Sequence, residues 1–242
     1  MQGRHSVMTE SLPIIAVPGL MCSARLYADQ IPALWPFGPV TIADHRRDES
    51  MDAIAHRILD SAPPRFALIG LSMGGYIAAA ILRQAPERVA KLALLDTSAR
   101  ADLPERMQGR RILIEMVEQG RFAEVVDLHF PQFVHKNRRD DAALKRVVAL
   151  MAEETGPHAY VRQQTAIINR KDWRAALPQI RCPTLVVVGD ADEMTPPKVA
   201  EEIAGGITGA RLVVVPDCGH LTTLERPAAV NAALTAWMNG EA

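Results

Sequence analysis

The sequence predicts an α/β protein built on a mostly parallel sheet of about six strands, with helices on both faces. Short runs rich in Val, Ile and Leu recur along the chain without the polar–apolar alternation of half-exposed strands, which is typical of strands buried on both faces. Helical patterns separate most successive runs, as parallel strands joined by crossover helices require. A purely helical stretch between the fourth and fifth strands indicates an insertion.

The predicted strands are the apolar runs themselves. They cover residues 12–17, 39–44, 65–71, 91–96, 184–190 and 211–217, of which the second is the weakest. Helical patterns are found at residues 24–34, 50–61, 73–84, 196–204 and 226–239. Strand and helix therefore alternate near both ends of the chain, and we expect residues 1–99 and 171–242 to form one α/β core.

Between residues 100 and 170 the alternation stops and only helical patterns are found, separated by Gly120, Gly156 and Pro157. We expect residues 100–170 to form a helical cap, with the substrate pocket between the cap and the sheet edge. Arg162 and Arg170 of this block have the reach to meet an acidic substrate, but solvation at the surface is the expected use of both side chains.

Composition excludes several classes of partner. The chain has 242 residues, of which 48% are hydrophobic, enough for one core with an insertion. Its formal net charge of −1 favours neither nucleic acid nor a membrane surface. No apolar run has the length of a signal peptide or a membrane span. Three cysteines without a C-x-x-C motif predict a reducing, cytoplasmic compartment, and the seven histidines show no metal-ligand spacing.

The stretch GLSMG, residues 70–74, is the first candidate for chemistry. In a sharp turn from strand to helix, Cβ atoms at Gly70 and Gly74 would collide with the flanking backbone, so glycine fits both positions. The turn would hold Ser72 in a strained conformation at the carboxyl edge of the sheet, where open α/β sheets bind ligands. The amide of Met73 would face a developing negative charge. A simple turn explains the motif equally well. Whether Ser72 is a nucleophile therefore depends on whether the chain supplies partners that activate it.

A serine nucleophile needs a base and an acid that orients the base. The last two predicted strands run into polar segments that place Asp192 and His220 a few residues past the strand ends. Parallel strands share their carboxyl edge, so both side chains would emerge beside Ser72. Asp96 and Asp190 also follow strands and remain alternatives for the acid, although an aspartate at a strand end is often only a loop-fixing residue.

The chain resembles the α/β-hydrolase fold family, in particular capped bacterial esterases and enol-lactone hydrolases. The motifs GLSMGG, PTLVVVGDADEMTPP and DCGHLTTLERP carry the resemblance, in the family's order of nucleophile, acid and base. It implies Ser72, Asp192 and His220 as the catalytic triad. It also places a second oxyanion donor in the loop after the first strand, at Leu20, with Met21 as the alternative.

One departure from the family concerns the loop after the first strand. Relatives usually carry His-Gly there, and this chain has Pro18-Gly19, which leaves open what holds the loop. We interpret His45 as a loop or rim residue. We interpret Cys22 as a small buried apolar residue rather than a nucleophile.

The resemblance implies acyl transfer to water through an acyl-enzyme on Ser72, with no metal or organic cofactor. The expected partner is a small-molecule acyl substrate: a carboxylic ester, a lactone or a thioester. The same residues would support C–C bond hydrolysis or perhydrolysis, but Leu221 stands where C–C hydrolases tend to carry an aromatic residue. A ligand receptor or interaction scaffold with little turnover is the remaining alternative.

Overall fold

In the part of the chain that the structure describes, the sheet has six strands, all parallel. The computed structural model describes residues 11–241. The strands are β1 (Ile14–Val17), β2 (Val40–Ile42), β3 (Phe66–Leu71), β4 (Val89–Leu95), β5 (Thr184–Gly189) and β6 (Arg211–Val215). They lie side by side in the order β2-β1-β3-β4-β5-β6. The predicted α/β class and the predicted sheet of about six strands are therefore confirmed.

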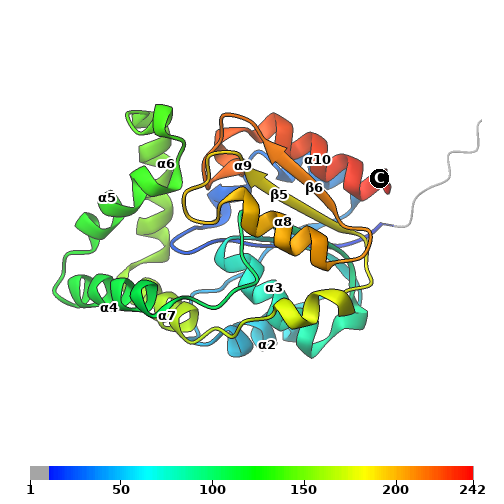
Figure 1. The fold of residues 1–242 in the computed structure, drawn as a ribbon, viewed down its shortest axis with the longest axis horizontal. Helices are drawn as coiled ribbons and strands as arrows, with labels where there is room; N and C mark the ends of the chain where they lie inside the picture. The colour runs from blue at the N-terminus through cyan, green and yellow to red at the C-terminus, as the bar shows by residue number, and fades with distance from the viewer. Residues whose placement is uncertain (1–10, 242) are drawn as a thin grey trace, which may run out of the picture.

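Helices cover both faces of this sheet. One face carries α2 (Met51–Ser61), α3 (Met73–Gln84) and α8 (Pro197–Gly206), and the other carries α1 (Ile31–Leu34) and α10 (Pro227–Asn239) (Figure 1). Every residue of β1, β3 and β5 is consequently buried. This burial explains why these strands appear in the sequence as continuous apolar runs.

Two predicted elements differ in the structure. The helix expected at residues 24–34 is split into a 3₁₀ turn (Ala24–Tyr27) and the short helix α1, because Pro32 lacks the N–H of a helix interior and fits only the first turn of a new helix. The strand β6 is not buried on both faces. It is one of the two edge strands of the sheet, and Val214 is 45% exposed.

Four helices lie between β4 and β5, within the segment 100–170 that the sequence marks as an insertion. They are α4 (Pro104–Glu118), α5 (Phe122–Phe133), α6 (Ala142–Thr155) and α7 (Pro157–Ile168), coloured green to yellow-green at the left of Figure 1. We call them the cap. That the cap forms a domain separate from the core stays a prediction. Within residues 11–241, no helix is both long enough and apolar enough to span a membrane.

The strand order fixes where a ligand site is expected. From β1 the chain moves outward to β2, and from β3 it moves the opposite way to β4, β5 and β6. The direction therefore reverses between β1 and β3. Open α/β sheets bind ligands at the carboxyl ends of the strands beside such a reversal. The loop after β1 and the turn after β3 contain Leu20 and Ser72, the two positions expected to act on a carbonyl.

Candidate active site

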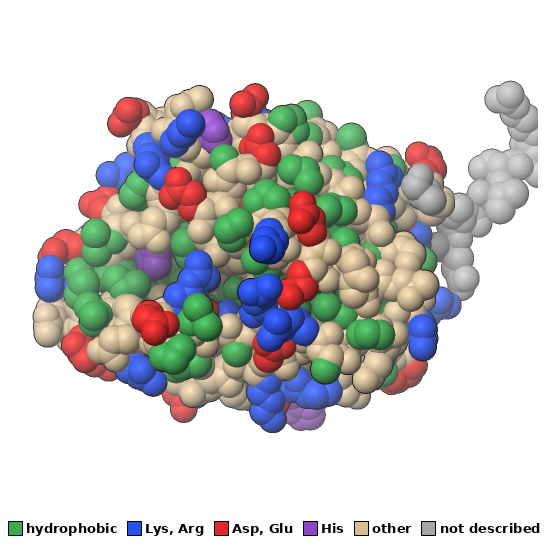
Figure 2. All heavy atoms as spheres, viewed as in Figure 1, with side chains coloured by type: hydrophobic (Ala, Val, Ile, Leu, Met, Phe, Trp, Pro, Cys, Tyr) green, Lys and Arg blue, Asp and Glu red, His purple; other side chains and the backbone are tan. Residues whose placement is uncertain are grey.

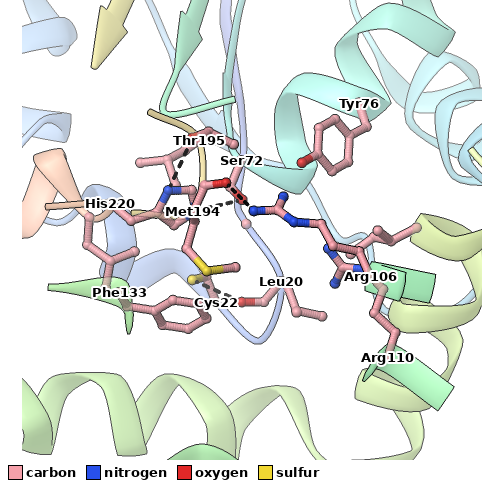
Figure 3. A pocket seen from close by; sticks show the side chains of 14 residues that line it. Leu20, Cys22, Ser72, Tyr76, Arg106, Arg110, Phe133, Met194, Thr195 and His220 are labelled. Atoms are coloured by element: carbon pink, nitrogen blue, oxygen red, sulfur yellow. Dashed lines mark hydrogen bonds between the residues drawn. The ribbon is translucent and has the colours of Figure 1, made fainter. Parts of the chain in front are cut away.

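Ser72 occupies the turn between β3 and α3 in a conformation that L-residues rarely adopt. Its φ is 54° and its ψ is −112°. A Cβ atom on Gly70 would lie 2.4 Å from the carbonyl oxygen of Gly74, and one on Gly74 would lie 2.1 Å from that of Val17. Only glycine allows this close backbone approach. The turn holds the Ser72 side chain at the edge of the pocket (Figure 3).

Three side chains form a continuous chain of hydrogen bonds. The Oγ of Ser72 lies 2.9 Å from Nε2 of His220, and Nδ1 of His220 lies 2.8 Å from Oδ2 of Asp192. Because an ionised carboxylate only accepts hydrogen bonds, Nδ1 carries the imidazole proton and donates it. Nε2 of the neutral ring is therefore free to accept the hydroxyl proton of Ser72. The structure thus brings together the three residues that the resemblance implies.

The electrostatics of this chain favour a protonated imidazole next to an ionised acid. Burial alone would lower the pKa of His220, but the charge of Asp192 and its hydrogen bond outweigh burial and raise the pKa above the ordinary value. Burial would likewise raise the pKa of Asp192, yet the charge of His220 and several hydrogen bonds hold it below the ordinary value. The pair is therefore arranged to stabilise an imidazolium.

The loop after β5 fixes the Asp192 carboxylate. Its Oδ1 accepts the amides of Met194 and Thr195 at 2.8 and 2.9 Å, and its Oδ2 accepts the Thr195 hydroxyl at 2.7 Å. With the bond from His220, both oxygens are saturated in one orientation. The role of Thr195 was not predicted. The spacing Asp-x-x-Thr could have indicated this role, because an aspartate often accepts hydrogen bonds from backbone amides two and three residues further along the chain.

The two alternative acids make other contacts. Asp96 is fully buried, and its carboxylate accepts the amide of Gly189 at 3.1 Å and the hydroxyl of Thr222 at 2.5 Å. Burial and the nearby charge of Asp192 raise the pKa of Asp96. Asp190 accepts the amide of Cys218 at 3.0 Å. Neither has a hydrogen bond to His220 among the described residues, and both fasten neighbouring loops together.

Two backbone amides remain available beside Ser72. In residues 11–241, the N–H groups of Leu20 and Met73 have no hydrogen-bond acceptor. The amide of Met21, the alternative donor, is occupied because it donates to Oε1 of Gln163 in the cap at 3.0 Å. The contact of Gln163 thus leaves Leu20 and Met73 as the pair able to face an oxyanion.

His45 lies in the loop after β2, as one of its two interpretations has it, but it is not a rim residue: it holds the loop that carries Leu20. The His45 side chain is buried, and its Nε2 lies 2.9 Å from the carbonyl oxygen of Gly19. Burial lowers the pKa of His45 to about 4, so the ring is neutral near pH 7. A carbonyl only accepts, so Nε2 carries the proton. His45 thus supplies support to a loop that lacks the usual His before its Gly19.

The pocket lies between the sheet edge and the cap and encloses about 480 Å³, part of it open to solvent. Figure 2 shows the hollow between the cap and the body of the molecule, with Lys or Arg side chains along its rim. The pocket is lined by Gly19, Leu20, Cys22, Leu71, Ser72, Tyr76, Arg106, Arg110, Phe133, Ile167, Met194, Thr195, His220 and Leu221. Burial raises the pKa of Cys22 to about 12, so its thiol stays protonated and does not compete as a nucleophile.

The expectation for Arg170 is wrong. Its side chain is buried, donates to Asp102 at 2.7 Å and stacks over the ring of Tyr76 at 4.2 Å. It is therefore part of a buried ion pair under the cap and is not solvated at the surface.

The cap is tied to the loop that carries His220. The amides of His220 and Leu221 both donate to the carbonyl oxygen of Phe133, at 3.0 and 3.1 Å. The buried carboxylate of Glu225 accepts the amides of Gly219 and His135, each at 2.8 Å. The sequence does not indicate these ties, because they depend on how the end of α5 lies on the core. Across the described part of the chain, no group of three or more His, Cys, Asp or Glu side chains is placed to hold a metal ion.

Comparison with other proteins identifies the family. The sequence model of the alpha/beta hydrolase fold matches residues 32–227. The chain is 31% identical to pimeloyl-[acyl-carrier protein] methyl ester esterase of Nitrosomonas europaea, over 74% of this chain and 73% of that protein. A thermophilic esterase from Thermogutta terrifontis superposes with a TM-score of 0.85 at 28% identity, covering 95% of this chain and 90% of that chain.

The enol-lactonase of Burkholderia xenovorans LB400 shares the fold. Its TM-score is 0.86 at 23% identity, with 98% of this chain and 94% of that chain covered.

One conclusion follows from the fold, the order of the motifs and the match over most of the sequence. The chain belongs to the α/β-hydrolase family.

Proposed function

We propose that this chain hydrolyses a small carboxylic ester, lactone or thioester through an acyl-enzyme on Ser72. The observation that carries the proposal is the unbroken line of hydrogen bonds from Ser72 Oγ through His220 to Asp192. A serine hydroxyl is a poor nucleophile unless a base removes its proton as it attacks. The neutral Nε2 of His220 is within reach of that proton.

In the first half of the reaction, Ser72 Oγ attacks the substrate carbonyl while His220 Nε2 takes the hydroxyl proton. Asp192 stabilises the resulting imidazolium and keeps the ring in its tautomer. Negative charge develops on the carbonyl oxygen, and the free amides of Leu20 and Met73 are the groups proposed to bind it. The imidazolium then protonates the leaving group, and the acyl group stays on Ser72.

In the second half, His220 acts on water. Nε2 removes a proton from a water molecule as the water attacks the acyl-enzyme carbonyl. The same two amides bind the second oxyanion. Collapse of the intermediate returns the proton to Ser72 Oγ and releases the acid. The cycle needs only residues of this chain.

Among these substrate classes, esters have the strongest support. The relative in Nitrosomonas europaea is named as a methyl ester esterase, and the structural neighbour in Thermogutta terrifontis is named as an esterase. We accordingly place methyl and other short esters first and lactones and thioesters after them. The proposed partner is a small-molecule acyl compound. The cytoplasmic location remains a prediction from the cysteine content.

A panel of substrates tests the proposal. Wild-type protein is assayed with p-nitrophenyl acetate and butyrate, a methyl ester, a lactone, a thioester and a diketone. Ser72→Ala should retain the fold by circular dichroism and lose turnover by up to about 10⁶-fold. Ser61→Ala, at the end of α2 and away from the pocket, is the matched control and should keep wild-type turnover.

Three results would contradict the proposal. Turnover by Ser72→Ala at the wild-type rate would remove this serine from the mechanism. Cleavage of the diketone alone would point to C–C bond hydrolysis. Absence of turnover with every substrate would favour a receptor or scaffold.

A further inference from the structure

The cap side of the pocket carries an excess of positive charge. Arg106 and Arg110, both on α4, line the pocket together with Ser72 and His220. No Asp or Glu of residues 11–241 lines it. The carboxylate of Asp192 lies behind the His220 ring, to which it is already bonded. A substrate that reaches Ser72 therefore meets guanidinium groups and no exposed carboxylate.

One carboxylate serves two of the guanidinium groups in this region. Buried Asp102 accepts from Arg110 at 2.5 Å and from Arg170 at 2.7 Å. Arg110 also donates to Oε1 of Gln164 at 2.7 Å. These bonds hold Arg110 in place. The single negative charge of Asp102 has to balance the positive charges of both Arg110 and Arg170. The positive potential at the cap side of the pocket is therefore only partly compensated.

Of the two arginines that line the pocket, Arg106 has fewer of its donors engaged. Its only hydrogen bond in the described part of the chain goes from Nη2 to the carbonyl oxygen of Met194, at 3.0 Å, and no carboxylate there pairs with it. A guanidinium has five N–H donors. Figure 3 shows the Arg106 side chain reaching from the cap across the pocket, with its guanidinium toward Ser72 and Met194. The remaining donors are accordingly available to a molecule in the pocket.

We propose that Arg106 binds a carboxylate of the substrate, so that the preferred esters are monoesters of dicarboxylic acids. The inference rests on the proposed ester hydrolysis and adds the charge of the substrate to it. A guanidinium binds a carboxylate through two parallel hydrogen bonds between opposite charges. A carboxamide of the same shape is neutral and has only one acceptor oxygen, so it cannot form this pair. Arg110 adds to the attraction through its field, while Arg106 makes the contact.

Matched pairs of esters test this charge preference. Monomethyl succinate, glutarate and adipate are each compared with the analogue in which a carboxamide replaces the free carboxylate. The series covers a range of distances between the ester and the charge. For the best length, wild-type kcat/KM should favour the anion by about ten- to hundredfold, the range that hydrogen bonds to charged groups give.

Two variants on the same helix locate the preference. Arg106→Gln should abolish the preference, because kcat/KM for the anion should fall until it equals kcat/KM for the carboxamide. Arg111→Gln is the matched control, because Arg111 is exposed on α4 and does not line the pocket. It should keep the wild-type preference.

The failure of this inference differs from the failure of the proposed function. Equal kcat/KM for anion and carboxamide, or a preference that survives Arg106→Gln, would overturn the role of Arg106 while p-nitrophenyl butyrate is still hydrolysed. If wild-type protein hydrolyses neither p-nitrophenyl butyrate nor any methyl ester, the proposed function falls, and the inference falls with it.

Discussion

Ser72 lies beside the imidazole of His220 because three segments far apart in the sequence end at one edge of the sheet. The turn after β3 presents Ser72, and the loops after β5 and β6 present Asp192 and His220. Each side chain is then fixed by neighbours: Asp192 by three further hydrogen bonds from the Met194–Thr195 segment, and the His220 loop by the carbonyl of Phe133. In the proposed mechanism, the orientation of Asp192 sets the tautomer and the charge of His220.

Replacement of the acid tests which carboxylate orients His220. Asp192→Asn should leave the fold intact and lower kcat by about 10⁴-fold, because an amide favours the wrong imidazole tautomer. Asp96→Asn replaces one of two buried acceptor oxygens with an NH2 donor that faces Gly189 or Thr222, so it should cost about 1–3 kcal/mol of stability and much less activity. The two variants are compared on one p-nitrophenyl ester and by urea unfolding. A larger loss of kcat in Asp96→Asn would move the acid to the strand β4.

The pH profile tests the coupling between the base and the acid. His220 must be neutral to accept the Ser72 proton, so kcat/KM should fall as the pH drops through its pKa. The charge of Asp192 raises that pKa, and the midpoint should therefore lie above the ordinary histidine value of about 6.5.

The variant profile supplies the control. In Asp192→Asn the raising charge is gone and burial remains, so the midpoint of the residual activity should move to lower pH. A midpoint that is the same in both proteins would show that Asp192 does not set the charge of His220.

The three side chains of the hydrogen-bonded chain could be predicted because each stands in a motif of fixed spacing. Thr195 and His45 could not, because their partners are an aspartate oxygen and a backbone carbonyl whose positions depend on folded loops. Arg170 was misplaced for the same reason. Its acceptor, Asp102, is 68 residues away in the sequence, and no local pattern marks their approach.

Two turns at the ends of neighbouring strands build the rest of the site. The loop after β1 carries Leu20 and is fixed from two sides, by His45 on Gly19 and by Gln163 on Met21. The turn after β3 carries Ser72 and packs against the first strand through Gly74. Both turns therefore depend on close contacts that a small substitution would disturb.

His45→Ala should lower kcat about ten- to hundredfold with a smaller change in KM. Without the hydrogen bond from His45 to the Gly19 carbonyl, the loop that carries the Leu20 amide should shift. A displacement near 1 Å of a group that contacts the reacting atoms has an effect of this size. His45→Gln keeps an N–H donor and should recover part of the loss. The measurement is steady-state kinetics on one neutral ester. Equal activity of His45→Ala and wild type would show that the loop holds its shape unaided.

Gly74→Ala should destabilise the protein by at least about 1–3 kcal/mol, because its Cβ would lie 2.1 Å from the backbone oxygen of Val17. Gly109→Ala is the opposite case. Gly109 lies inside α4, and beyond its chain neighbours and the backbone of its own helix no described atom lies within 4 Å of the added Cβ, so alanine should stabilise the helix by roughly 0.5–1 kcal/mol. Urea unfolding measures both. A Gly74→Ala protein as stable as wild type would contradict the close contact at the elbow.

For whole elements, apolar runs located all six strands, but the pattern does not say which strand is at the edge. The three valines of β6 resemble those of β5, yet only β5 has a neighbour on each side. The helix predicted at residues 24–34 was too long, because its apolar pattern continues across Pro32. Proline has no N–H to donate and therefore fits the first turn of a new helix.

For the molecule as a whole, the proposed site follows from the strand order and from the insertion. The reversal between β1 and β3 opens a crevice at the carboxyl edge, and the cap closes it into a pocket with arginines on its far wall (Figure 3). The sequence predicted the class and the insertion from periodicity. It did not predict that the cap contributes positive charge to the pocket, because α4 has to fold over the sheet before Arg106 faces Ser72.

The central claim is that Ser72 is the nucleophile, and covalent labelling tests it most directly. A fluorophosphonate reacts with a serine activated by a neighbouring base. Wild-type protein should gain one adduct by intact-mass spectrometry, located by peptide mapping to Ser72, and lose ester hydrolysis in proportion to labelling. Ser72→Ala should gain none. An adduct on another residue, or a folded wild-type protein that stays unlabelled, would contradict the account.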